Sequence, residues 1–174
     1  MNPSWPRYWT QALAEVLGEA LAQQWLRQVP PPPPGTFPTG LLALMAQTFG
    51  PRAGAGVASR VGEALFRHWL ADRRPQGAWR LLPLPRRVTT GLTWLTQDLA
   101  LAWGGAFQVR AQDQGWRIVS RLPIPAPWSP LACLLWWGFF QEALYWLTAR
   151  VYPLETCEEA SAPCCLAVPA HPLY

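Results

Sequence analysis

One long apolar segment, from Leu131 to Val151, constrains the fold of this chain more than any other feature. Its residues are hydrophobic on nearly every side of a helix, and only Gln141 and Glu142 interrupt them. A helix that is apolar all round needs cover on several sides, so it belongs in the middle of a domain. The uninterrupted stretch, Leu131 to Phe140, is too short for a membrane span, which needs ~20 residues. We therefore expect a buried central helix and no membrane span.

Apolar residues recur at helical spacing in four segments before this one, at about residues 6–28, 39–49, 53–72 and 88–103. Gly50 and Pro51 separate the second segment from the third, because proline removes a helix hydrogen bond and clashes with the preceding turn. These patterns predict a helical layer made of four helices.

Five consecutive prolines, Pro30 to Pro34, follow the first helical segment. Such a run forms a stiff polyproline II spacer of ~15 Å. It divides the chain into an N-terminal amphipathic helix at 1–29, a spacer at 30–36 and an α+β domain at 37–174. The first helix either packs on a partner chain or folds back on its own domain. If the first helix packs on a partner chain, the protein is a homodimer. The apolar stripe of this helix would then lie near the partner; it consists of Trp9, Leu13, Leu17 and Leu21.

Two pairs of strand-like segments complete the pattern. Residues 106–112 and 116–122 alternate between apolar and polar, and Gly115 in the connector favours a β-hairpin. Residues 152–157 and 164–169 flank a polar connector and form a second hairpin. The order is helices, hairpin, helix, hairpin. We therefore predict an α+β fold, with an antiparallel sheet of two hairpins packed against a helical layer.

The combination of a helix with a cysteine-bearing hairpin resembles the C-terminal signature of the 4-vinyl-reductase-domain family. The residues concerned are Cys133 on the helix and Cys157 and Cys165 on the hairpin. The run from Arg60 to Arg67 resembles an early helix of the same family. These predicted hydrocarbon-binding proteins share their fold with transport-complex subunits and with aromatic-sensor domains. The resemblance covers about residues 37–168 and implies a small-molecule-binding module.

Cys133, Cys157 and Cys165 are the candidate metal ligands, because zinc is commonly held by thiolates in a tetrahedral set. In the aromatic-sensing relatives, a Glu three residues before the first hairpin Cys completes the set. Here that position is Leu154, and Glu155 follows it, so the fourth ligand stays open and Cys164 is an alternative to a carboxylate. Two other states stay open: buried thiols without a ligand, or a disulfide, which needs an oxidising compartment.

The first residues, Met1 to Trp9, lack a charged start, an apolar run and a cleavage site, so we expect no secretory signal and a cytoplasmic protein. The net charge is +4, and all fourteen basic residues are Arg. They are scattered, apart from the pairs Arg73–Arg74 and Arg86–Arg87. Nucleic-acid binding requires a clustered basic patch or stripe, so we expect no nucleic-acid partner.

The chain has twelve Trp, and wide aromatic side chains suit a core that also lines an apolar pocket. No phosphate-binding loop, dinucleotide fingerprint or nucleophile elbow occurs. His68 and His171 have no catalytic partner at a readable spacing, so we expect no catalytic residue. The expected pocket lies between the sheet and the helices and is lined by six aromatic residues: Trp94, Trp103, Phe107, Trp116, Trp137 and Phe140.

The leading hypothesis is therefore a non-catalytic domain that binds or senses a small apolar or aromatic ligand, since such pockets are mostly apolar with few polar groups. A structural dimerisation or scaffold module is the second hypothesis. The third is an accessory or reductase role in bacteriochlorophyll synthesis, which the resemblance alone implies.

Overall fold

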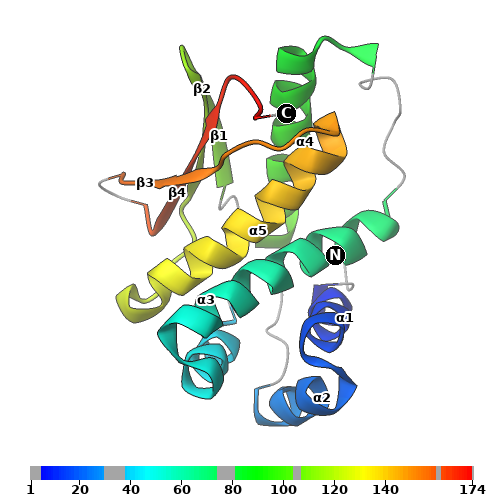
Figure 1. Cartoon of the computed structure of the whole chain (residues 1–174), viewed down its shortest axis with the longest axis vertical. Coiled ribbons are helices and arrows are strands. Elements are labelled where there is room, and N and C mark those ends of the chain that lie inside the picture. Colours follow the sequence, from blue (N-terminus) through cyan, green and yellow to red (C-terminus); the bar gives the residue numbers. More distant parts are fainter. Residues whose placement is uncertain (1–4, 30–37, 74–80, 104–106, 160–161, 174) are drawn as a thin grey trace.

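The structure is a computed structural model that describes residues 5–29, 38–73, 81–103, 107–159 and 162–173, without the side chains of 102 and 103. It confirms the α+β fold and the order of helices, hairpin, helix and hairpin (Figure 1). The proline spacer lies outside the described residues. The helices are α1 (Trp5–Leu17), α2 (Glu19–Gln28), α3 (Thr39–Ala71), α4 (Leu84–Trp103), the short 3₁₀ helix η2 (Ala126–Trp128) and α5 (Ser129–Thr148); the strands are β1 (Phe107–Gln112), β2 (Gly115–Ser120), β3 (Glu155–Cys157) and β4 (Cys164–Pro169).

The N-terminal segment, expected as one helix, consists of two. Gly18 separates α1 from α2 with φ 80°, a left-handed conformation that glycine adopts without steric cost. Helix α1 packs against α3 of the same chain, and Trp9 and Leu13 are buried. Trp9 and Leu13 are thus covered within the chain, whereas Leu17 and Leu21 are partly buried. The structure gives no support to a dimer formed through Trp9 and Leu13.

The second and third expected helices are the two arms of α3, divided at Gly50 as the sequence predicted. Gly50 breaks it with φ 74° and ψ 175°, and Pro51 begins the second arm. That second arm crosses the central helix α5, as Figure 1 shows. A Cβ on Gly62 would overlap the carbonyl oxygen of Leu135, and a Cβ on Gly138 would overlap that of Ser59. Both glycines are therefore needed for the close approach of the two helices.

The four strands form one antiparallel sheet in the order β1-β2-β4-β3. Its inner face packs on α5 and α4. The Phe107 ring lies 4.7 Å from that of Trp136 and 5.8 Å from that of Phe140. At the other end of β2, Trp116 Nε1 donates a hydrogen bond of 2.9 Å to Thr89 Oγ1. Aromatic rings thus fill the space between sheet and central helix.

Candidate functional site: a cleft bordered by two disulfides

An open cleft of about 840 Å³ lies where α5 begins and the β3–β4 hairpin returns over it. Three elements supply the lining: the first turns of α5, the end of β3 and the start of β4, together with part of the connector between the strands. The described lining residues are Ser129, Pro130, Cys133, Leu134, Thr156, Cys157, Glu158, Glu159, Ala162, Pro163, Cys164 and Cys165.

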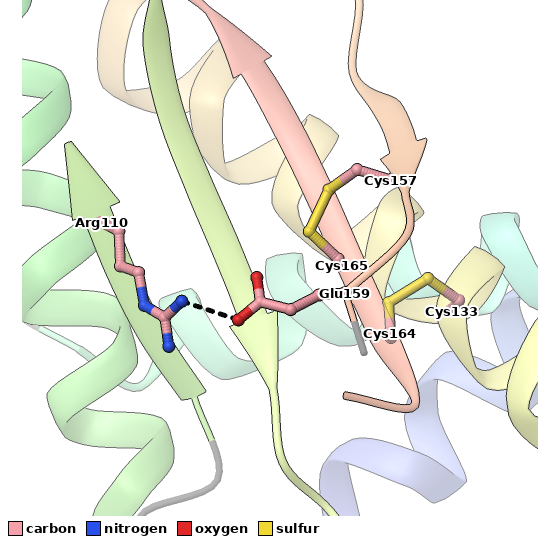
Figure 2. The surroundings of a disulfide bond; sticks show 6 residues. All are labelled: Arg110, Cys133, Cys157, Glu159, Cys164 and Cys165. Carbon is pink, nitrogen blue, oxygen red and sulfur yellow. Dashed lines mark hydrogen bonds and ion pairs between the residues drawn. A yellow bond between two sulfur atoms is a disulfide. The ribbon is translucent and has the colours of Figure 1, made fainter. Parts of the chain in front are cut away.

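All four cysteines of the chain border this cleft and are paired in two disulfides (Figure 2). Cys133 of α5 is bonded to Cys164 of β4, with Cα atoms 5.1 Å apart. Cys157 of β3 is bonded to Cys165 of β4, with Cα atoms 5.0 Å apart. Both Cα separations lie within the ordinary range for disulfides. The two bonds therefore attach β4 to a helix and to an edge strand at adjacent residues.

Strand geometry explains this pairing. Successive side chains of a strand point to opposite faces of the sheet. Cys164 lies opposite Ser120, in the row of Phe107, on the inner face towards α5. Cys165 lies directly opposite Cys157 on the outer face. We name the Cys133–Cys164 bond the inner disulfide and the Cys157–Cys165 bond the outer disulfide.

The predicted zinc site is wrong. Cys133, Cys157 and Cys165 do not form one ligand set, because each is in a disulfide and they are divided between two faces of the sheet. In the part of the chain that the structure describes, no group of three or more His, Cys, Asp or Glu side chains could hold a metal ion. Sequence reasoning considered Cys164 only as an alternative zinc ligand and missed its bond to Cys133. The adjacent pair Cys164–Cys165 was the available signal, since alternation along a strand sends the two thiols apart.

The connector after β3 lies over part of the outer face of the sheet, where it contacts β1. Glu159 Oε1 accepts a hydrogen bond of 2.6 Å from Nη1 of Arg110 on β1, as Figure 2 shows. Val119 and Cys165 share this face and are only 1% exposed. An ion pair across the strands thus accompanies the burial of Cys165.

The structure places the six predicted pocket residues in several regions. Phe107 and Phe140 meet in the core, whereas the Trp94 ring lies against that of Trp69, 5.1 Å away. Trp137 Nε1 donates to the carbonyl oxygen of Leu154 at 2.9 Å. None of these four lines the disulfide cleft. Trp116 lines a second, smaller cleft of about 300 Å³ beside the β1–β2 turn, and the Trp103 side chain lies outside the described part.

A separate group of charged side chains joins three helices. Glu15 of α1 contacts Arg67 and His68 of α3, at 2.5 Å and 2.9 Å. Arg67 Nη1 also lies 3.4 Å from Oε1 of Glu142 on α5. Arg67 is therefore an ion-pair partner of the carboxylate that interrupts the apolar sequence of the central helix. Burial alone would raise the pKa of Glu15. The hydrogen bonds and positive charges of Arg67 and His68 outweigh the effect of burial, and the pKa of Glu15 is lowered.

The opposite shift occurs at a neighbouring carboxyl. Burial and the negative charge of Glu142 raise the pKa of Glu63, against the opposing charges of Arg67 and Arg60. Glu63 is thus stabilised in its protonated form, in contrast to Glu15. None of these groups lines the disulfide cleft, so we assign them to the packing of the helices.

No known protein family matches this chain, and no curated protein matches it. The resemblance to the 4-vinyl-reductase-domain family therefore stays a prediction. Within the described residues, no helix is both long enough and apolar enough to cross a membrane.

Proposed function

We propose that this chain is a non-catalytic binding module that takes a small, mainly apolar molecule in the disulfide cleft. The observation that carries the proposal is the cleft itself. Its volume of about 840 Å³ is of the size that ligand sites have, roughly 300–1,000 Å³. Its walls include two proline side chains, Leu134 and the paired cysteines, which offer apolar contact without strong hydrogen-bonding groups.

Polar groups at the same site favour a neutral or cationic ligand. Ser129 and Thr156 supply hydroxyl groups that can both donate and accept hydrogen bonds. Glu158 adds a carboxylate that is exposed at the cleft and repels anions. An apolar body with one donor group therefore suits the cleft, because a few polar contacts orient a ligand that apolar walls hold.

Packing of the core favours this site over the interior. Phe107, Trp136, Phe139 and Phe140 make mutual ring contacts between the sheet and α5. On the opposite side of α5, the Gly138 backbone is in close contact with α3. The disulfide cleft, and not the interior between sheet and helix, is therefore the proposed ligand site.

Saturation binding of the neutral dye Nile red tests the proposal. We expect one saturable site on the oxidised chain, and we expect Ala162→Trp, which fills the cleft, to weaken binding by about tenfold or more, equal to 1.4 kcal/mol. Ala20→Trp is the matched control, because Ala20 is exposed on α2, away from the lining residues. Equal dye binding by Ala162→Trp and Ala20→Trp would contradict the proposed site.

A scaffold role is the second candidate, and the aromatic filling of the core favours it. A scaffold domain needs a rigid surface but no accessible interior. The same titration separates the two roles: a chain that shows no saturable dye binding at all supports the scaffold. Sedimentation of that chain then reports whether copies associate.

A further inference from the structure

We propose that the outer disulfide, Cys157–Cys165, is a site of thiol–disulfide exchange with an external dithiol, whereas the inner disulfide, Cys133–Cys164, is structural. The partner is defined by its chemistry: a small dithiol or a protein with a Cys-X-X-Cys pair. This inference does not depend on ligand binding in the cleft.

Unequal exposure distinguishes the two bonds. Cys157 is partly exposed, whereas Cys133, Cys164 and Cys165 are 8%, 4% and 1% exposed. All four border the open cleft, so a thiolate that enters it meets Cys157 as the most accessible cysteine. Rates of exchange depend on which sulfur can be attacked and on access to it.

The two disulfides also connect different elements to β4. The outer disulfide joins β4 to β3, an edge strand of only three residues whose ladder partner is β4. The inner disulfide joins β4 to α5, whose residues form much of the core. Opening the outer bond therefore requires only a short edge strand to move, whereas opening the inner bond separates β4 from the central helix.

The exchange is a two-step displacement. A thiolate of the external dithiol attacks Sγ of Cys157, forms a mixed disulfide with it and expels the Cys165 thiolate, which takes a proton from water. The second thiol of the partner, once deprotonated, then attacks the first sulfur of the partner, which is bonded to Sγ of Cys157 in the mixed disulfide. The Cys157 thiolate leaves and is protonated. The partner is oxidised to a disulfide, and Cys157 and Cys165 are reduced to two thiols.

The sheet geometry should stop the reaction at this stage. The freed Cys165 thiol points to the outer face, whereas Sγ of its neighbour Cys164 lies on the inner face in the other bond. An internal attack would need the start of β4 to unwind. We therefore expect a half-reduced species with two thiols to accumulate.

Partial reduction tests the order of opening. The oxidised full chain is treated with limiting dithiothreitol, quenched with iodoacetamide and mapped by peptide mass spectrometry. We expect Cys157 and Cys165 to be alkylated about tenfold faster or more than the other pair, since access controls the rate. Earlier labelling of Cys133 and Cys164, or equal labelling of all four, would overturn the proposal.

Two further measurements make the test specific. In a denaturant that unfolds the chain, the preference for the outer bond should largely disappear, because it arises from burial; a preference that persists unchanged would contradict this origin. A Cys-X-X-Ser protein with a single attacking cysteine should trap a mixed disulfide at Cys157. Trapping at Cys133, Cys164 or Cys165 would overturn the assignment of Cys157 as the attacked residue.

Discussion

Gly62 of α3 and Gly138 of α5 occupy one helix crossing, where each glycine lies against the backbone of the other helix. The Gly62 position faces the carbonyl of Leu135, and the Gly138 position faces that of Ser59. The contact of Gly62 with Leu135 is followed by that of Phe66 with Phe139, so the two helices run in the same general direction, as Figure 1 shows. Any side chain larger than that of glycine at either position would force the two helices apart. The two glycines therefore determine the distance between α3 and α5.

The first prediction concerns this crossing. Gly138→Ala should lower the free energy of unfolding by about 1–3 kcal/mol, the usual cost of overpacking a core, because the added methyl overlaps the Ser59 backbone. Urea unfolding followed by circular dichroism measures the change. Gly56→Ala is the control within α3: nothing lies within 4 Å of its Cβ position, and alanine should stabilise the helix by about 0.5–1 kcal/mol. An equal effect of both substitutions would contradict the close crossing.

The second prediction concerns the two disulfides. Replacing either pair by alanine should lower the free energy of unfolding by about 2–4 kcal/mol, because the bond restricts the unfolded chain. The inner pair spans 31 positions and the outer pair eight, so loss of the inner bond should cost more. Urea unfolding of the Cys133→Ala/Cys164→Ala and Cys157→Ala/Cys165→Ala variants tests the order. A larger loss from the outer pair would be the opposite of what loop length predicts.

The third prediction concerns the end of α5. Ala149 ends the helix with φ 54° and ψ 31°, a left-handed conformation that a side chain disfavours. Ala149→Gly should therefore raise stability by about 1 kcal/mol. Ala55→Gly within α3 should instead lower stability by about 1 kcal/mol, as glycine does in a helix interior. Thermal unfolding of both variants measures the contrast, and a loss of stability in Ala149→Gly would show that the conformation is not strained.

The fourth prediction concerns acid sensitivity at Glu15. The pKa of Glu15 is lowered in the folded chain, so its ionised form adds stability above the ordinary glutamate pKa of 4.5. This stability is lost as pH falls through the pKa of the folded chain. Glu15→Gln should therefore lower the melting temperature at pH 7, and the difference from the unsubstituted chain should close in strong acid. Melting curves between pH 2 and 7 measure this; a difference that does not vary with pH would contradict an electrostatic origin.

The fifth prediction has the opposite sign. The pKa of Glu63 is raised in the folded chain, so its protonated form adds stability that is fully present below the ordinary glutamate pKa of 4.5. This stability is lost as pH rises through the pKa of the folded chain. Glu63→Gln, which removes the charge that burial and Glu142 disfavour, should raise the melting temperature at pH 7 and have little effect in acid. The two variants, measured in the same buffers, should therefore depart from the unsubstituted chain in opposite directions at neutral pH. A lower melting temperature for Glu63→Gln at pH 7 would contradict the raised pKa.

Local patterns were enough to predict most of the fold. Apolar spacing predicted the helices from 39 to 103, alternation predicted the first hairpin, and the apolar run after Leu131 predicted a buried central helix; the structure contains all of them. These features depend on residues a few positions apart, whose periodicity reflects which side of a segment is covered. The break at Gly18 was missed, because the apolar spacing continues across it while only the backbone conformation changes.

The candidate site shows where sequence reasoning stops. The cysteine positions indicated a site at the second hairpin, but three thiols were assigned to zinc and the bond between Cys133 and Cys164 was not predicted. The pairing depends on which face of the sheet each residue occupies, and the register of β4 against β2 and β3 decides that. Likewise, the Gly62–Gly138 crossing and the cover of α1 by α3 join segments far apart in the chain. The sequence alone thus determined the helices, the strands and their apolar faces, whereas the tertiary structure decided which faces meet. The spacing of apolar residues within a segment shows that one side is covered, but it does not show which distant segment covers it.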